Sequence, residues 1–140
     1  RICQFRIMHK NNISTQKTIF NAMNTPTEFA RIIYGIVAQL GGDEFTGLAR
    51  VTPYRFVPEV HSFLKYECCG IKANFDGKIV LIMYDRGKDL YIVVCANGCK
   101  NPTKVYQDLY LDKVKDIIEA ETGITMPEVE YYEDCIVTDF

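Results

Sequence analysis

The chain has 140 residues, of which 48% are hydrophobic and 24% charged, and its 16 basic and 18 acidic side chains leave a net charge of -2. This composition is that of an ordinary globular domain, which argues against a disordered chain and against a strong field that would attract nucleic acid or anionic lipid. The longest apolar runs have six or seven residues, whereas a membrane-spanning helix needs roughly 20. We therefore expect one soluble globular domain over residues 1–140.

The N-terminal part of the chain predicts a hairpin followed by a helix. Residues 2–8 alternate between wetter and more apolar side chains, which is typical of a strand, and after a turn at Asn11-Asn12 residues 18–20 can return as a second strand. Thr25-Pro26-Thr27-Glu28 then combines a capping threonine, a proline at the first helical position and a capping-box glutamate. The apolar stripe that follows predicts a helix over 26–40, ended by Gly41-Gly42.

The stretch 43–69 has no single period. Pro53 and Pro58 interrupt it, and its aromatic residues fit either extended chain or a short helix after Pro58. The sequence leaves this segment as a mixture of strand and helix.

Residues 70–96 predict a three-stranded antiparallel meander. Asp76-Gly77 is a strong hairpin-turn pair, and the turn 85–89 joins two apolar runs, 79–84 and 90–96. Each run is apolar on both of its faces, so neither strand is expected to leave one side in water. Both sides of this sheet must therefore be covered.

The C-terminal part predicts a long helix and an acidic tail. Asn101-Pro102 resembles a helix start, an apolar stripe continues to residue 118, and Gly123 resembles a helix end, which together predict a helix over 102–122. The tail, 128–140, contains acidic residues but no basic ones. We expect it to add an edge strand or to serve as a partner-binding extension.

This order of elements predicts an α+β fold with a single antiparallel sheet: hairpin, helix, three-stranded meander, helix. Over about residues 77–121, where a strand, a short turn, a second strand and a long helix follow one another, it resembles the longin-like fold of adaptor small chains and transport-complex subunits, a layout that we describe as longin/profilin-like. The resemblance implies a function in binding partners through the sheet edge and the first helix, in assemblies of membrane traffic, and not in a catalytic pocket.

One motif points to an enzyme. Gly41-Gly42-Asp43-Glu44-Phe45 spells the motif that names the diguanylate cyclases, in which carboxylates hold metal ions. The strand expected at 2–8 has no acidic residue to complete a two-metal site, and two glycines directly after a helix are ordinary capping residues. We interpret the motif as a helix stop and keep a degenerate nucleotide-cyclase-like domain as the third reading.

The six cysteines favour reduced thiols and a cytoplasmic, intracellular site, because a chain with this much apolar material does not need disulfides for stability. A zinc site from His61 and the pairs Cys68-Cys69 and Cys95/Cys99 is an alternative, but no regular ligand spacing supports it. Cys68 or Cys69 with His61 also lacks the surroundings of a known cysteine enzyme. The sequence predicts no catalytic residue, metal or cofactor.

The leading functional reading is a non-enzymatic protein-interaction domain that binds a protein partner or a second copy of itself. The partner-contacting residues that we predict come from the first helix, the mixed segment and the tail: Arg31, Tyr34, Tyr54, Arg55, Phe56, Tyr131 and Tyr132. The alternative is a nucleic-acid-binding domain, because basic and aromatic side chains alternate irregularly over residues 50–66. Its predicted contacts are Arg50, Arg55, Lys65 and Tyr66.

Overall fold

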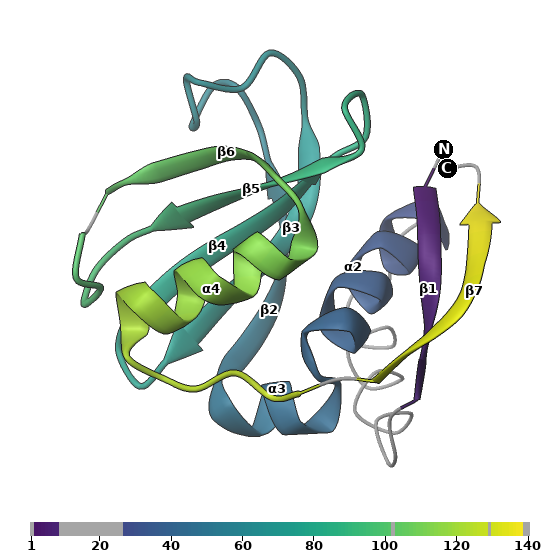
Figure 1. Cartoon of the computed structure of the whole chain (residues 1–140). Helices are drawn as coiled ribbons and strands as arrows, with labels where there is room; N and C mark the ends of the chain where they lie inside the picture. Colours follow the sequence, from purple (N-terminus) through teal and green to yellow (C-terminus); the bar gives the residue numbers. More distant parts are fainter. Residues whose placement is uncertain (1, 9–26, 102, 129, 139–140) are drawn as a thin grey trace.

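A computed structural model describes residues 2–8, 27–101, 103–128 and 130–138 of the chain. Its main body is a five-stranded antiparallel sheet whose strands lie side by side in chain order (Figure 1). These strands are β2 (Arg50–Phe56), β3 (Cys68–Phe75), β4 (Lys78–Asp85), β5 (Leu90–Cys95) and β6 (Val105–Leu109). The predicted meander is confirmed as β3, β4 and β5, and the structure extends it by one strand on each side.

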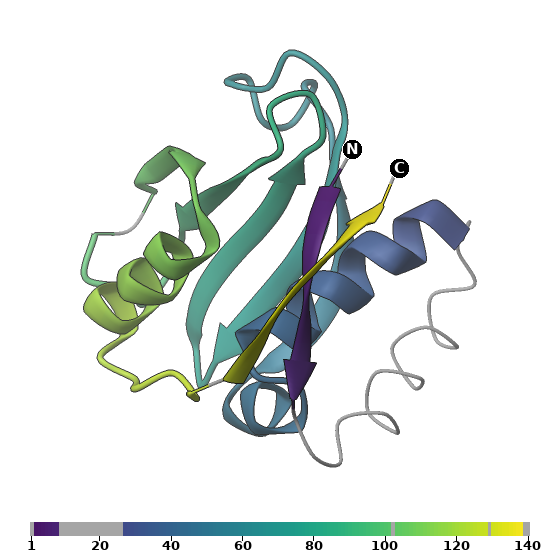
Figure 2. The ribbon, with the colours of Figure 1, turned by 45° about the vertical axis from the view of Figure 1, so that its right-hand side comes forward.

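Over the residues that the structure describes, three helices accompany the sheet: α2 (Thr27–Leu40), α3 (Asp43–Leu48) and α4 (Leu111–Thr122). The two longer ones, α2 and α4, lie on the same face of the sheet (Figure 2). Their apolar sides meet side chains of β3, β4 and β5 in one core, in which Ile33, Ile82 and Ile118 are fully buried. The predicted helix 26–40 is confirmed over the residues that the structure describes.

The opposite face of the sheet is covered by the loop that joins β2 to β3, residues 57–67. Leu64 of this loop is buried in a second cluster with Met83 and Ile92, and Phe63 packs against the same cluster. Tyr66 at the end of the loop donates a hydrogen bond to Asp85, which is buried at the end of β4. The prediction that both faces of the two apolar strands are covered is therefore confirmed, although Leu81 of β4 is only half-buried.

The predicted terminal helix, 102–122, is wrong over residues 103–110. Residues 105–109 form strand β6, which pairs with β5, and α4 begins only at Leu111. Val105 and Tyr106 favour a strand, and without β6 the nearly fully buried strand β5 would form the edge of the sheet. Asp108 adopts φ 58, where β6 is irregular, and the chain then turns into the helix at Tyr110.

The two ends of the chain form a separate two-stranded sheet. β1 (Ile2–Met8) pairs antiparallel with β7 (Glu130–Thr138), as Figures 1 and 2 show. The predicted strand over 2–8 is confirmed, and the tail does form a strand. The single sheet that we expected to contain them is not observed, because these two strands pair with each other and not with the meander. The predicted return strand 18–20 lies outside the described residues.

The mixed segment resolves into α3, β2 and the covering loop. Gly41 and Gly42 end α2 with φ values of 130 and 58, a region that favours glycine, and α3 starts at once with Asp43. β2 is an edge strand that contains Pro53, which carries no N–H group. Among the described residues, no helix has both the length and the apolar character needed to cross a membrane.

Candidate functional site

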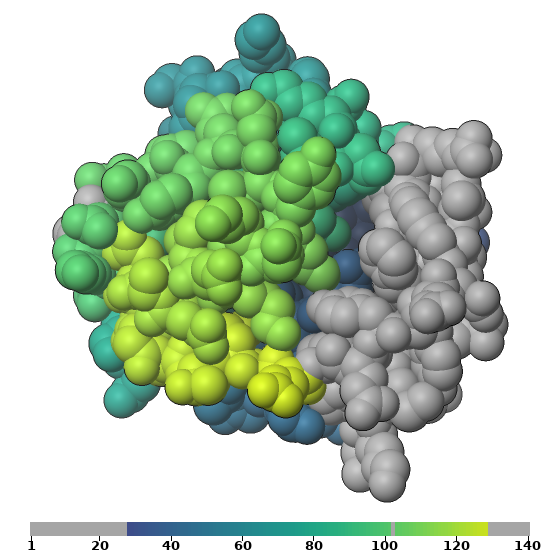
Figure 3. Space-filling view, viewed as in Figure 1, coloured from purple at the N-terminus to yellow at the C-terminus, as the bar shows by residue number. Residues whose placement is uncertain are grey.

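A groove of about 930 Å³ lies beside α4. We call it the α4 groove and define it by its walls: α4, the ends of β5 and β6, the segment 125–128, and Gln39 of α2. In Figure 3 the surface is hollowed next to α4, where atoms of α2 are visible deeper in the molecule. A concavity of this size is in the range of ligand and peptide sites.

The wall formed by residues 125–128 is held in place by hydrogen bonds to α4. The backbone N–H of Met126 donates to Glu119 Oε2 at 2.8 Å, and Lys115 Nζ donates to the carbonyl oxygen of Pro127 at 2.7 Å. On its other side Pro127 packs so closely against Gly41 that a Cβ atom there would lie 2.8 Å from Pro127 Cγ. The wall formed by residues 125–128 is therefore held between α4 and Gly41 by the fold itself.

The apolar part of the α4 groove comes from β5, β6 and the start of α4. Tyr91, Leu109 and Leu111 are partly buried there. Tyr110 is 71% exposed, the highest value among the large hydrophobic side chains that the structure describes. An exposed aromatic at the edge of an apolar hollow is typical of a residue that anchors a protein partner.

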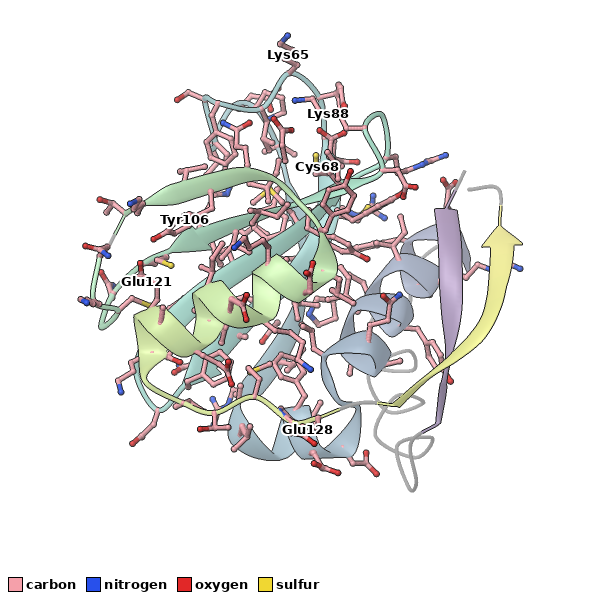
Figure 4. All side chains as sticks on the ribbon, viewed as in Figure 1. Lys65, Cys68, Lys88, Tyr106, Glu121 and Glu128 are labelled. Atoms are coloured by element: carbon pink, nitrogen blue, oxygen red, sulfur yellow. The ribbon has the colours of Figure 1, made fainter. Side chains whose placement is uncertain are left out.

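The polar part of the α4 groove is acidic. Five carboxylates line it, from Asp89, Asp112, Asp116, Glu119 and Glu128, against the single lysine Lys115. Asp112 and Asp116 are four residues apart on α4 and so share one face of the helix. Figure 4 labels Glu128, which lies below α4 in that view.

A second polar cluster lies at the far end of α4, around the buried carboxylate of Glu121. It accepts hydrogen bonds from the backbone N–H of Asn101 at 2.7 Å, from Asn101 Nδ2 at 2.9 Å and from Tyr106 Oη at 2.5 Å. Burial alone would raise the pKa of Glu121, but these hydrogen bonds outweigh it and leave the pKa lowered. The same hydrogen bond, with burial, raises the pKa of Tyr106 to about 12. Each oxygen has partners, so this cluster acts as a structural anchor (Figure 4).

The four cysteines whose side chains the structure describes, Cys68, Cys69, Cys95 and Cys99, are free thiols. Burial raises the pKa of all four, to about 11 for Cys68 and about 12 for Cys95. A raised pKa disfavours the thiolate, the form that attacks substrates and binds metal. Over the described residues no three His, Cys, Asp or Glu side chains gather in a way that would hold a metal ion.

The predicted partner-binding residues are spread over several surfaces. Arg31 and Tyr34 are exposed on α2 and engaged in contacts, and Tyr54 is exposed on the edge strand β2. Arg55 pairs with Glu67 at 3.4 Å, and its guanidinium lies 4.2 Å from the centre of the Phe29 ring. Phe56 is fully buried and belongs to the core under the covering loop. The side chains of Tyr131 and Tyr132 lie outside the described residues.

The predicted nucleic-acid contacts do not form one continuous basic track. Arg50 follows α3 at one end of the sheet, whereas Lys65 lies at the opposite end (Figures 1 and 4). Between them, Arg55 is paired with the carboxylate of Glu67, and the hydroxyl of Tyr66 is bonded to Asp85. A groove that binds single-stranded nucleic acid instead needs successive positive charges along the path of the phosphate backbone.

The Gly41–Phe45 motif occupies the junction of two helices. Asp43 and Glu44 form the first turn of α3, and Phe45 is fully buried in the core. This arrangement differs from the hairpin that the cyclase reading requires, and it agrees with the interpretation of the glycines as a helix stop.

Sequence reasoning did not find the α4 groove, because its lining comes from separate segments between residues 39 and 128 and its outer wall depends on where α4 begins. The available signals were the carboxylates on the polar side of the predicted helix and the acidic tail directly after it.

Comparison with known proteins adds no candidate site: no family model, no curated protein and no solved structure matches this chain.

Proposed function

We propose that this chain is a protein-interaction domain that acts as a subunit of a larger intracellular assembly and binds its partner through the α4 groove. The observation that carries the proposal is the position of Tyr110, an aromatic side chain 71% exposed at the edge of a preformed hollow with an apolar floor. Burying such a ring against a partner is a large source of binding free energy, and aromatic residues dominate interface hot spots.

The chemistry of the described residues supports binding over covalent catalysis. The free thiols are held in their protonated form by burial, and the buried carboxylate Glu121 is occupied by hydrogen bonds from Asn101 and Tyr106. Neither group lines the α4 groove. The residues that do line it are those of an interface: aromatic and aliphatic side chains inside a polar rim.

The longin-like resemblance and a setting in membrane traffic remain part of this proposal. The α+β arrangement of helices against an antiparallel sheet is in keeping with that resemblance. The resemblance implies binding through the sheet edge and the first helix, whereas the groove proposed here lies beside α4, the last helix. The comparisons give no independent support for it.

A photo-crosslinking experiment tests the proposal. A photoreactive phenylalanine analogue replaces Tyr110 in one sample and Val60 in another, because Val60 is the next most exposed large hydrophobic residue, at 67%, and lies on the covering loop outside the groove. Both proteins are exposed to extract of the source cells and illuminated, and the crosslinked protein is identified. It is then purified, and its affinity for the unmodified chain is measured by calorimetry.

We expect a defined partner that crosslinks from position 110 and not from position 60. Its affinity should fall at least about tenfold with Tyr110→Ala, the loss expected of an aromatic anchor, and stay unchanged with Val60→Ala. A partner whose affinity is equally insensitive to both substitutions would overturn the proposal. Light scattering at several concentrations tells whether the partner is a second copy of the chain.

A further inference from the structure

The α4 groove concentrates negative charge in a chain that is nearly neutral. The whole chain has 16 basic and 18 acidic side chains, whereas the groove is lined by five carboxylates and one lysine. The excess of acid over base is therefore a local property of this surface. It creates a potential that attracts positive charge at the place where the apolar floor is open to a partner.

Three of these carboxylates are not neutralised by the described part of the protein. No hydrogen bond or ion pair to another described residue engages the side chains of Asp112, Asp116 or Glu128. Glu119 accepts one hydrogen bond from the Met126 backbone, and Asp89 accepts one from Tyr84 Oη at 2.5 Å. The lysine of the groove is already used, because Lys115 Nζ donates to the Pro127 carbonyl.

The residues that follow the groove in the sequence are also acidic. Segment 128–140 begins at the groove wall, has acidic residues at 128, 130, 133, 134 and 139, and has no lysine or arginine. This distribution makes a second copy of the chain a poor occupant, because two copies that meet through this surface would place like charges against each other.

We infer that the occupant of the α4 groove is a basic amphipathic segment of a partner protein, with lysine or arginine residues beside leucine-type side chains. This inference rests on the proposed function and adds the chemistry of the partner. The apolar side chains of the segment pack on Tyr110, Leu109 and Leu111, and its cations lie against Asp112, Asp116 and Glu128. The charges raise the rate of encounter and set its orientation, and the apolar contacts supply most of the affinity.

Three synthetic peptides of about 18 residues test the inference by fluorescence anisotropy. The first has leucine on one helical face and lysine at its borders, the second has glutamate in place of each lysine, and the third has serine in place of each leucine. The chain is used as wild type, as Tyr110→Ala, and as the double variant Asp112→Asn/Asp116→Asn. A control double variant, Asp76→Asn/Glu59→Gln, makes the same change of net charge at exposed positions outside the groove.

We expect only the leucine–lysine peptide to bind the wild type. Its affinity should fall roughly 3- to 10-fold in the Asp112→Asn/Asp116→Asn variant, a range set by two partly exposed charge pairs, and should not fall in the control variant. Raising the salt concentration from about 50 to about 500 mM should weaken wild-type binding more than variant binding, because salt screens the charges. Melting temperatures of all variants show that each one is folded.

If the glutamate peptide bound as tightly as the leucine–lysine peptide, the inference that the occupant is basic would be wrong. If the serine peptide bound as tightly, the inference that the occupant is amphipathic would be wrong. A wild-type dimer that is lost in Tyr110→Ala would overturn the inference in favour of a second copy. If no peptide binds while the crosslinked partner still depends on Tyr110, the inference fails and the proposed function stands. If the leucine–lysine peptide binds as expected but the crosslinked partner is insensitive to Tyr110→Ala, the proposed function fails.

Discussion

Tyr106 of β6 donates a hydrogen bond of 2.5 Å to the buried carboxylate of Glu121 in the last turn of α4. This bond connects the added edge strand to the helix that covers the sheet. Asn101 donates two more hydrogen bonds to the same carboxylate, so Glu121 also holds the loop that leads into β6.

The first prediction concerns the coupling of these two side chains. Glu121→Gln should lower the free energy of unfolding by about 1–3 kcal/mol, because it replaces a charged acceptor that serves several donors. Tyr106→Phe should cost about 1–2 kcal/mol. Measured by urea unfolding, the loss of unfolding free energy in the double variant should be smaller than the sum of the two single losses, by about 1.5 kcal/mol or more. Strictly additive effects would show that the bond contributes nothing.

The second prediction concerns acid stability. The pKa of Glu121 in the folded chain is lowered below its ordinary value of 4.5 by the hydrogen bonds from Tyr106 and Asn101, which outweigh the effect of burial. Its contribution to stability is therefore complete above pH 4.5 and is lost as the pH falls through the folded pKa, because the unfolded chain then binds more protons. The difference in stability between wild type and Glu121→Gln should shrink over this range in urea titrations at successive pH values. A difference that is constant with pH would contradict the prediction.

The third prediction concerns alkaline stability and the covering loop. A hydrogen bond to Asp85, together with burial, raises the pKa of Tyr66 to about 12 from its ordinary value of 10. The bond is intact below pH 10 and its contribution is lost as the pH rises toward 12, because the unfolded chain then releases the phenolic proton more readily. In Tyr66→Phe, this part of the fall in stability at alkaline pH should be absent. Hydrogen exchange of residues 57–67 should be faster in this variant, and unchanged exchange would show that the bond does not hold the loop.

The fourth prediction compares two glycines. A Cβ atom at Gly70 would meet the carbonyl oxygen of Ile82 and lie 2.6 Å from Met83 Cα, both backbone atoms of β4, whereas one at Gly47 in α3 would have nothing within 4 Å. Gly70→Ala should therefore destabilise the chain by at least about 2 kcal/mol, since the strands must move apart. Gly47→Ala should be neutral or stabilising by up to about 1 kcal/mol. Thermal unfolding of both variants checks this, and equal melting temperatures would contradict the close approach of β3 and β4.

The fifth prediction concerns the thiols. Burial raises the pKa of Cys68 to about 11 and that of Cys95 to about 12, so their thiolate fraction at pH 8 is very small. Iodoacetamide should modify them far more slowly in the folded chain than in urea. Cys69 is only half-buried and should react before both of them. Peptide mass mapping over time gives the order, and fast modification of Cys95 in the folded chain would contradict its burial.

The sequence was sufficient for those parts of the fold in which one local signal dominates. The meander was predictable because Asp76-Gly77 sets one turn and because the runs 79–84 and 90–96 are apolar on both faces. The start of α4 was not predictable, since Val105, Tyr106 and Leu109 fit a helical stripe as well as a strand. Pairing with β5 favours the strand, because β5 gains a neighbouring strand on this side only if residues 105–109 are extended.

The candidate site was out of reach for a related reason. Asp112 and Asp116 could be placed on the polar side of a helix from the sequence, but a solvated helix face and one wall of a groove have the same pattern of residues. The two cases differ only because residues 125–128 run back along α4, where Lys115 and Glu119 hydrogen-bond to their backbone. Such a return is a long-range contact with no local sequence signature.

Pro53 has a consequence for how this chain meets others. It lies in β2, one outer border of the five-stranded sheet, and the other border, β6, is interrupted where Asp108 takes a positive φ. A foreign strand laid along either border would meet a gap in the row of backbone donors and acceptors. Copies of the domain are thus poor templates for joining edge to edge into one continuous sheet through either of these borders.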